Sequence, residues 1–316
     1  MGAVAMRLIR LVSVAFALAI SGAANAHVLD SGERQAPSLT WSFEPWVVIL
    51  LVTSLVLYIR GWLELRSRTK LGRPVHTRRL LAFVSGWLSL GASLCSPLDT
   101  LSDLLFSVHM VQHEAMMIVA APLMVLGQPI TMWLWAFSRK PRATIAGAFL
   151  NRGWLRFWHF ISAPMSAWFL HVAVLWGWHM PRYFEAALLS PCIHALQHLS
   201  FFLSATLLWW TIVGEASHGH RGAAMLSVFT TMVHTGALGA LLTLAPRVWY
   251  PSYIETCTAL GIDPLHDQQL GGLVMWVPTG LAYVIGAMII VWRWLMYRSG
   301  AGLVGHVSPA DSGEHT

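Results

Sequence analysis

The sequence has few charged residues. Asp, Glu, Lys and Arg make up only 11% of its 316 residues, whereas 56% are hydrophobic. Soluble domains carry about 25% charged residues, so this shortage excludes an ordinary water-soluble protein and places the chain in the membrane class. The formal net charge of +6 therefore gives no reason to expect a nucleic-acid partner, and its meaning depends on where the charges lie.

Cysteine is scarce as well, with Cys95, Cys192 and Cys257 as the three copies. Three cysteines exclude a disulfide-rich scaffold and leave either one disulfide with a spare thiol or thiols that could bind a soft metal. No series of acidic or basic residues crosses the full membrane, which argues against a copper or proton transporter. An H-E-x-x-H zincin motif is also absent, because Glu114 follows His113 but Met117 stands where the second histidine would be.

The first 26 residues predict a signal peptide. Arg7 and Arg10 precede a short apolar core, and Ala24-Asn25-Ala26 is an A-x-A cleavage site. Cleavage after Ala26 would leave His27 as the N-terminus, outside the cytoplasm. An uncleaved anchor is the alternative, although the apolar core is short for a membrane span.

Seven further apolar runs approach or exceed the roughly 20 residues that a spanning helix needs. We therefore expect an all-α membrane protein, a bundle of seven transmembrane helices within one polytopic domain at 27–298. A disordered cytoplasmic tail is expected at 299–316. The predicted spans are 44–63, 80–98, 104–126, 160–180, 193–214, 223–245 and 269–294.

The basic residues predict the orientation of the bundle. With the mature N-terminus outside, 15 Lys and Arg residues fall in inward segments and only Arg34, Arg182 and Arg247 fall outside. Inward-facing loops carry the excess of Lys and Arg in membrane proteins. The sequence thus predicts a bacterial plasma (inner) membrane protein with a periplasmic N-terminus and a cytoplasmic C-terminus.

Two copies of H-x-x-Q-H open two of the predicted spans on the outer side. His109 and His113 form one pair, and His194 and His198 form the other. Residues at i and i+4 lie about 5–6 Å apart on one helix face, so each pair could hold one metal ion. Gln112 and Gln197 precede the second histidine of each pair and could orient an imidazole through a hydrogen bond.

Further polar residues suggest two tiers of candidate ligands. His179, at the outer end of its span, would help the two pairs, while His171 and His234 lie deeper and could share a level with His113. Asp99 and Asp267 stand beside helix starts at the outer face and are candidates for a second tier. A single buried histidine can instead bond a hydroxyl or a backbone carbonyl of a neighbouring helix, and this explanation stays open for His171 and His234.

Copper is the metal that these residue types favour. Imidazole suits copper as well as zinc, iron and nickel, and soft sulfur ligands favour Cu(I). Methionines stand near the paired histidines, and the three cysteines all face outward in the predicted topology. Ordinary packing is the alternative explanation for the methionines, which are Met110, Met116, Met117, Met180 and Met275.

Three motifs resemble the polytopic CtaG family of cytochrome c oxidase assembly factors. They are "SPLDTLSDLLFSVHMVQHEAMMIVAAPLMVLGQP", "WGWHMPRYFEAALLSPCIHALQHLSFFLSATLLWW" and "DQQLGGLVMW", and the resemblance covers about 95–295. It implies a non-enzymatic role in maturing a haem–copper oxidase by supplying copper. Oxidase subunits, a periplasmic copper carrier and membrane lipid would be the partners. The motif positions are Asp99, His109, Gln112, His113, His179, His194, Gln197, His198, Asp267 and Gln268.

Two other functions fit paired histidines in a membrane. A haem b protein would use one histidine from each of two helices for electron transfer, which leaves the i, i+4 doubling unexplained. A metal-dependent membrane oxidase or hydroxylase would need carboxylates beside the histidines, and Glu114 is the one that lies close in sequence.

Overall fold

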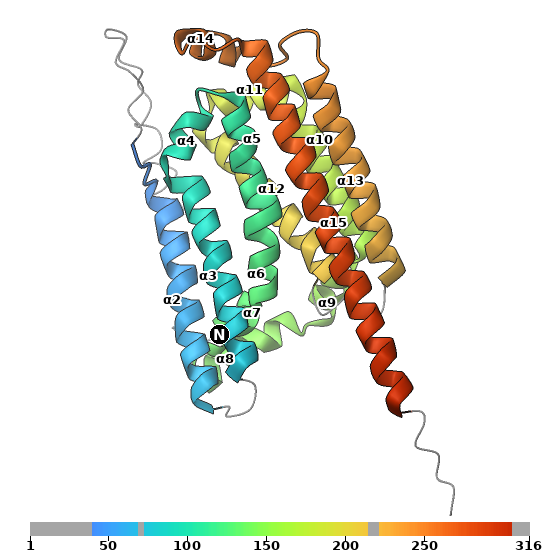
Figure 1. The fold of residues 1–316 in the computed structure, drawn as a ribbon. Coiled ribbons are helices and arrows are strands. Elements are labelled where there is room, and N and C mark those ends of the chain that lie inside the picture. The colour runs from blue at the N-terminus through green and yellow to red at the C-terminus, as the bar shows by residue number, and fades with distance from the viewer. Residues whose placement is uncertain (1–39, 69–72, 214–220, 305–316) are drawn as a thin grey trace, which may run out of the picture.

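The computed structural model describes residues 40–68, 73–213 and 221–304, and this part of the chain is helical without strands (Figure 1). The predicted signal peptide, His27 and residues 305–316 of the predicted tail lie outside the described residues. The elements are α2 Pro45–Arg68, α3 Arg73–Cys95, α4 Pro97–Ser102, α5 Phe106–Glu114, η2 Ala115–Ala120, α6 Ala121–Gly127, α7 Pro129–Trp135, α8 Arg139–Phe149, α9 Arg152–Ile161, α10 Pro164–His179, α11 Pro181–Leu189, α12 Pro191–Val213, α13 Arg221–Thr243, α14 Ser252–Ala259 and α15 Pro264–Val304.

Fewer helices have the length and composition of a membrane span than the seven predicted. Five do so among the described residues: α2, the α5–η2–α6 unit, α12, α13 and α15. The pair α9 and α10 makes a sixth if it counts as one span bent by 64°. The remaining predicted span, 80–98, corresponds to α3, a 23-residue helix whose first turns carry Arg78 and Arg79. Its basic start, with its Ser and Gly residues, makes α3 less apolar than the other spans.

The predicted span 160–180 is broken near its start. Helix α9 ends at Ile161 and α10 begins at Pro164, because proline lacks the N–H that would continue the helical hydrogen bonding. Helix α9 carries Arg152, Arg156 and His159 three or four residues apart, so they share one face, and aromatic residues lie on the other. Within the predicted span 160–180, the straight helix is therefore α10.

The span that carries the first histidine pair contains a π-helical turn. Helix α5 passes into η2 directly after Glu114, and α6 completes the span to Gly127. The wider turn releases backbone carbonyls, and side chains from other helices bond two of them. Ser89 Oγ donates to the Ala115 carbonyl at 3.4 Å, and Trp209 Nε1 donates to the Met117 carbonyl at 2.9 Å.

The helices pack so that α15 holds the histidine-bearing α5 in place. Helix α15 lies against both α13 and α5. Glycines permit this approach: a Cβ at Gly271 would stand 2.4 Å from the Phe106 ring, and one at Gly272 would stand 2.5 Å from Thr243 Oγ1. Close packing of membrane helices commonly depends on such small residues. The LGG of the third motif is therefore a packing feature.

The bundle has two distinct ends. Helices α4, α11 and α14 gather at one end, and α8 lies at the other (Figure 1). Helix α15 continues to Val304, so residues 299–304 of the predicted tail are helical.

Candidate metal centre

The two predicted histidine pairs belong to α5 and to the first turns of α12, which lie near the end of the bundle that carries α4, α11 and α14 (Figure 1). Within each pair the ring centroids are close, at 4.3 Å for His109 and His113 and 4.2 Å for His194 and His198. Between the pairs, His109 and His194 are 5.3 Å apart, and His113 and His198 are 5.1 Å apart. The structure thus brings two i, i+4 pairs from α5 and α12 into one cluster, which we call the four-histidine cluster.

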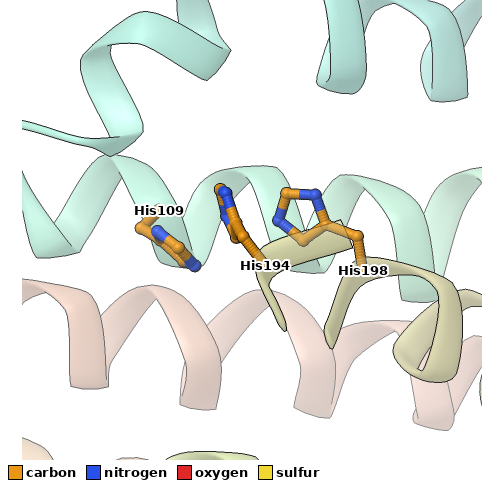
Figure 2. Close-up of side chains that lie close together, drawn as sticks. All are labelled: His109, His194 and His198. Carbon is orange, nitrogen blue, oxygen red and sulfur yellow. The ribbon is translucent and has the colours of Figure 1, made fainter. Parts of the chain in front are cut away.

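Three of these residues have the geometry of a metal-binding group. Ligand atoms of His109, His194 and His198 all lie within 4.8 Å of one another, and Figure 2 shows their three rings side by side. His109, His113 and His198 are buried, whereas His194 is half-buried. His194 is therefore the member of the cluster nearest to the surroundings of the protein.

Hydrogen bonds fix the proton position on two imidazoles. The Tyr253 hydroxyl donates its proton to the Ser102 carbonyl at 3.0 Å, so it accepts from His109 Nδ1, which lies 3.1 Å away. His179 Nδ1 lies 2.7 Å from the Leu175 carbonyl, which can only accept. In both residues Nδ1 must carry the hydrogen, and Nε2 keeps the lone pair that could bind a metal.

These lone pairs have no hydrogen-bond partner in the described part of the chain. Nε2 of His109, His179 and His198 and both ring nitrogens of His113 are buried and unpaired. Buried polar atoms are normally satisfied, and an unsatisfied one costs roughly 1–3 kcal/mol. Several buried imidazole nitrogens without partners, gathered at one place, have the chemistry of a set of metal ligands.

Aromatic rings enclose the cluster and connect it to His179. The ring of Phe184 lies 5.1 Å from His109 and 6.1 Å from His179, and Phe201 lies 4.6 Å from His113 and 5.8 Å from His179. His179 thus shares both phenylalanine walls with the four-histidine cluster. The predicted fifth histidine therefore lies at the edge of the candidate centre, in contact with the same two rings.

The two predicted aspartates position helices. Asp267, in the first turn of α15, accepts from the Phe106 N–H at 2.7 Å and from the Ser107 hydroxyl, and thereby caps the N-terminus of α5. Asp99 accepts from Ser42 Oγ at 2.7 Å and from the Gln112 amide at 2.7 Å. Both carboxylates accept hydrogen bonds from residues of α5, and they therefore help to position the helix that carries His109 and His113.

Two of the three predicted glutamines, Gln112 and Gln268, bond away from the imidazoles. Gln112 Nε2 donates to the Ser93 carbonyl and to Asp99, so it ties α5 to α3 and α4 instead of orienting a histidine. Gln268 accepts from the Trp249 N–H at 2.6 Å and donates to the Arg247 carbonyl at 3.3 Å, which fastens the loop before α14. Gln197 is fully buried on α12.

The deeper histidines form a separate pair. The rings of His171 and His234 lie 6.4 Å apart, and His171 Nδ1 lies 3.1 Å from Ser204 Oγ. His113, which the sequence analysis grouped with them by level, has its ring beside His109 and His198 in the four-histidine cluster.

Sulfur residues near the cluster serve packing. Met110 and Met117 lie in the main apolar core, Met116 lies in a second core with Tyr58 and Phe83, and Met180 is exposed. The three cysteines form no disulfide. Burial and the neighbouring Asp267 raise the pKa of the Cys257 thiol to about 11, which disfavours the thiolate that binds metals.

Several site residues were not foreseen. Tyr253, Phe184 and Phe201 approach the histidines from α14, α11 and α12 through tertiary packing, and no periodic pattern marks them. Glu114 was weighed as a carboxylate for a metal cluster, yet its side chain accepts from the Thr279 hydroxyl of α15.

Sequence comparisons find relatives of this chain among curated proteins. An uncharacterised protein of Mycobacterium leprae is 26% identical over 278 residues, which cover 82% of this chain and 41% of the relative. An uncharacterised protein of Mycobacterium bovis is 26% identical over 262 residues, which cover 80% of this chain and 39% of the relative. The chain therefore spans about two fifths of the length of these curated relatives. No solved structure matches.

The family comparison confirms the resemblance that the motifs carry. Residues 56–296 match the family described as cytochrome c oxidase caa3 assembly factor (Caa3_CtaG). This range includes both histidine pairs, His179 and the α15 residues that hold α5. The chain belongs to the cytochrome c oxidase caa3 assembly factor family.

Proposed function

We propose that this protein is a non-enzymatic membrane assembly factor that binds copper at the four-histidine cluster and supplies it to a haem–copper cytochrome c oxidase. Copper is here the cargo. His109, His113, His194 and His198 would be the main ligands, with His179 as a helper.

The observation that carries this proposal is the convergence of unpaired imidazole nitrogens. Four histidine rings from two helices stand within 4.2–6.0 Å of their neighbours. Packing requires no such arrangement, and neutral imidazoles are good copper ligands. Tyr253 supports this use because it holds His109 in the tautomer that presents Nε2, as second-sphere partners of metal-binding histidines do.

A copper donor must also release its ion. The cluster is buried behind Phe184 and Phe201, but His194 is half-buried at its edge. An ion held by reachable ligands can be handed on by exchanging one imidazole at a time for a ligand of the recipient. His194 would be the first ligand to receive copper and the last to let it go.

The location of the cluster suits exchange on the periplasmic side of a bacterial inner membrane. Basic residues lie at the opposite end of the bundle, in α8 and α9, in the last turn of α2 and in the first turns of α3. Such an excess of basic residues favours the cytoplasmic side. An oxidase subunit would be the recipient of copper, and a periplasmic copper carrier would be the source.

The rival functions fit the cluster less well. A dinuclear oxidase needs carboxylates beside its histidines, but the metal-binding group found among the described residues consists of histidines alone, and Glu114 bonds Thr279. A haem would need a single histidine on each side of the porphyrin, whereas here two rings of one helix lie 4.2 Å apart.

Replacing His113 and His198 together with alanine tests the function. Alanine favours helix, so the bundle should persist while the purified protein loses the copper that the four-histidine cluster binds. Cells carrying this variant should contain oxidase protein with little activity. Copper analysis, oxidase assays and a visible spectrum are the measurements, and a Soret band would instead indicate haem.

His266→Ala is the matched control. His266 lies near the same end of the bundle and its side chain is 78% exposed, so both copper content and oxidase activity should stay unchanged. The proposal would be refuted if the His113/His198 variant kept its full copper content and normal oxidase activity.

A further inference from the structure

A second pair of histidines lies away from the four-histidine cluster. His171 belongs to α10 and His234 to α13, and their ring centroids are 6.4 Å apart. His171 precedes His179 by two helical turns, about 12 Å along α10. His234 lies near the middle of α13, about 14 Å from Thr243 and about 20 Å from Arg221 at 1.5 Å per residue. The pair therefore lies deep in the bundle.

Helix packing accounts for one member of the pair. The Ser204 hydroxyl donates to the Phe201 carbonyl at 3.1 Å, so it accepts from His171 Nδ1 at 3.1 Å. The hydrogen of His171 then sits on Nδ1, and Nε2 keeps a lone pair. This is the bonding that buried histidines in membrane helices often show, and it is also the orientation that a metal ligand needs.

Packing does not account for His234. Both of its ring nitrogens are buried without a hydrogen-bond partner among the described residues, and so is Nε1 of Trp168, whose ring lies 5.8 Å away. A neutral imidazole has one donor and one acceptor, and a membrane interior supplies no bulk water to satisfy them. A buried water or an ion bound between the two histidines would remove this deficit.

The spacing of the rings fits a bound ion. Metal–imidazole bonds are about 2 Å long, so two imidazoles on opposite sides of one ion have centroids about 6 Å apart. The observed 6.4 Å agrees with this value. Structural zinc takes four protein ligands, and the group of three or more metal-binding residues found in the described chain lies elsewhere, at His109, His194 and His198.

Charge favours a monovalent ion at this depth. The cost of burying an ion in a low-dielectric interior rises with the square of its charge, and neutral imidazoles do not offset that charge. Monovalent copper is a d10 ion that accepts two ligands in line. We propose that His171 and His234 form a second copper site, selective for Cu(I), within the bundle.

The choice of metal rests on the proposed function, but the site is separate from the four-histidine cluster, so copper counts distinguish the two. Purified full-length protein is loaded with Cu(I) under anaerobic reducing conditions, desalted and analysed for copper per chain. The wild type should hold one copper at each site. His171→Ala/His234→Ala should lose one copper and keep the other, and His113→Ala/His198→Ala should show the complementary loss.

X-ray absorption on the His113/His198 variant then examines the deep site alone. Two nitrogen ligands and no sulfur ligand are expected. If the deep double variant fails to fold, His234→Gln gives the same count, because glutamine favours helix and can use both hydrogen-bonding groups. His266→Ala should keep the full copper content.

Three outcomes would overturn the deep site. They are full copper content in the His171/His234 variant, loss of all copper in the His113/His198 variant, and a Soret band that disappears with His171 and His234. The first two leave copper binding by the four-histidine cluster intact, and the first would assign the deep pair to a buried water. Conversely, if the His113/His198 variant keeps full content while the His171/His234 variant loses copper, the proposed function fails and the deep site stands.

Discussion

At the scale of single residues, proton positions decide what the cluster can bind. Tyr253 and the Leu175 carbonyl each take the Nδ1 hydrogen of one histidine and leave its Nε2 lone pair available. The paired histidines could be predicted because i, i+4 spacing is a local property of a helix. Tyr253 could not, since it reaches His109 across 144 positions of sequence and no short-range pattern encodes that contact.

The cysteines should differ sharply in reactivity. The raised pKa of about 11 keeps Cys257 protonated at neutral pH, and thiolates are the species that react with iodoacetamide. At pH 7.5 we expect alkylation of the exposed Cys192 and none of Cys257. The labelling of Cys257 should rise as the pH approaches 11, because its thiolate becomes populated there.

Peptide mapping by mass spectrometry measures this difference. Asp267→Asn removes a negative charge beside Cys257, so labelling of Cys257 should begin at a lower pH in that variant. Rapid labelling of Cys257 in the folded wild type at pH 7.5 would contradict the assignment.

At the scale of helices, the apolar runs predicted where most elements lie, but their internal breaks came from tertiary structure. The run 104–126 became α5, η2 and α6, and the π-helical carbonyls are bonded by Ser89 and Trp209 from other helices. The bend before α10 did have a local signal in Pro164. The proline break thus had a local signal that the predicted span 160–180 did not use, whereas the π-helical turn had none.

The contact of α2 with α7 predicts opposite effects of one substitution at two glycines. A Cβ at Gly61 would stand 1.7 Å from the Met132 carbonyl oxygen, whereas a Cβ at Gly147 meets nothing within 4 Å. Gly61→Ala should destabilise the fold by about 1–3 kcal/mol through overpacking. Gly147→Ala should stabilise α8 by up to about 1 kcal/mol, the helix preference of alanine over glycine.

Thermal unfolding in detergent compares the two variants. The midpoint should fall for Gly61→Ala and should hold or rise for Gly147→Ala. Equal shifts for both would mean that the close approach of α2 and α7 does not limit stability.

At the scale of the whole molecule, most of the basic residues lie at the end of the bundle opposite the histidine cluster. A helical membrane bundle with paired histidines at one end followed from the sequence, but seven spans did not emerge, since α3 is less apolar than the rest. Phosphatase fusions test the arrangement. Fusions after Arg68 and Lys140 should be inactive, and fusions after Asp103 and Asp263 should be active.

The fusions after Arg68 and after Asp103 are separated by α3, so unequal activity of these two would establish that α3 crosses the membrane. Activity after Lys140 together with inactivity after Asp263 would reverse the orientation and place the four-histidine cluster on the cytoplasmic side. Both outcomes can be read against equal amounts of fusion protein on an immunoblot.

The cap that Asp267 places on α5 has a consequence for the order in which the protein is made. Phe106 and Ser107 are synthesised 160 residues before the carboxylate that holds them. While the chain is still being translated, α5 lacks this cap and the approach of α15, although all four histidines of the cluster have already left the ribosome. A nascent chain therefore carries the ligands without their final geometry, and the completed centre forms only when α15 enters the membrane.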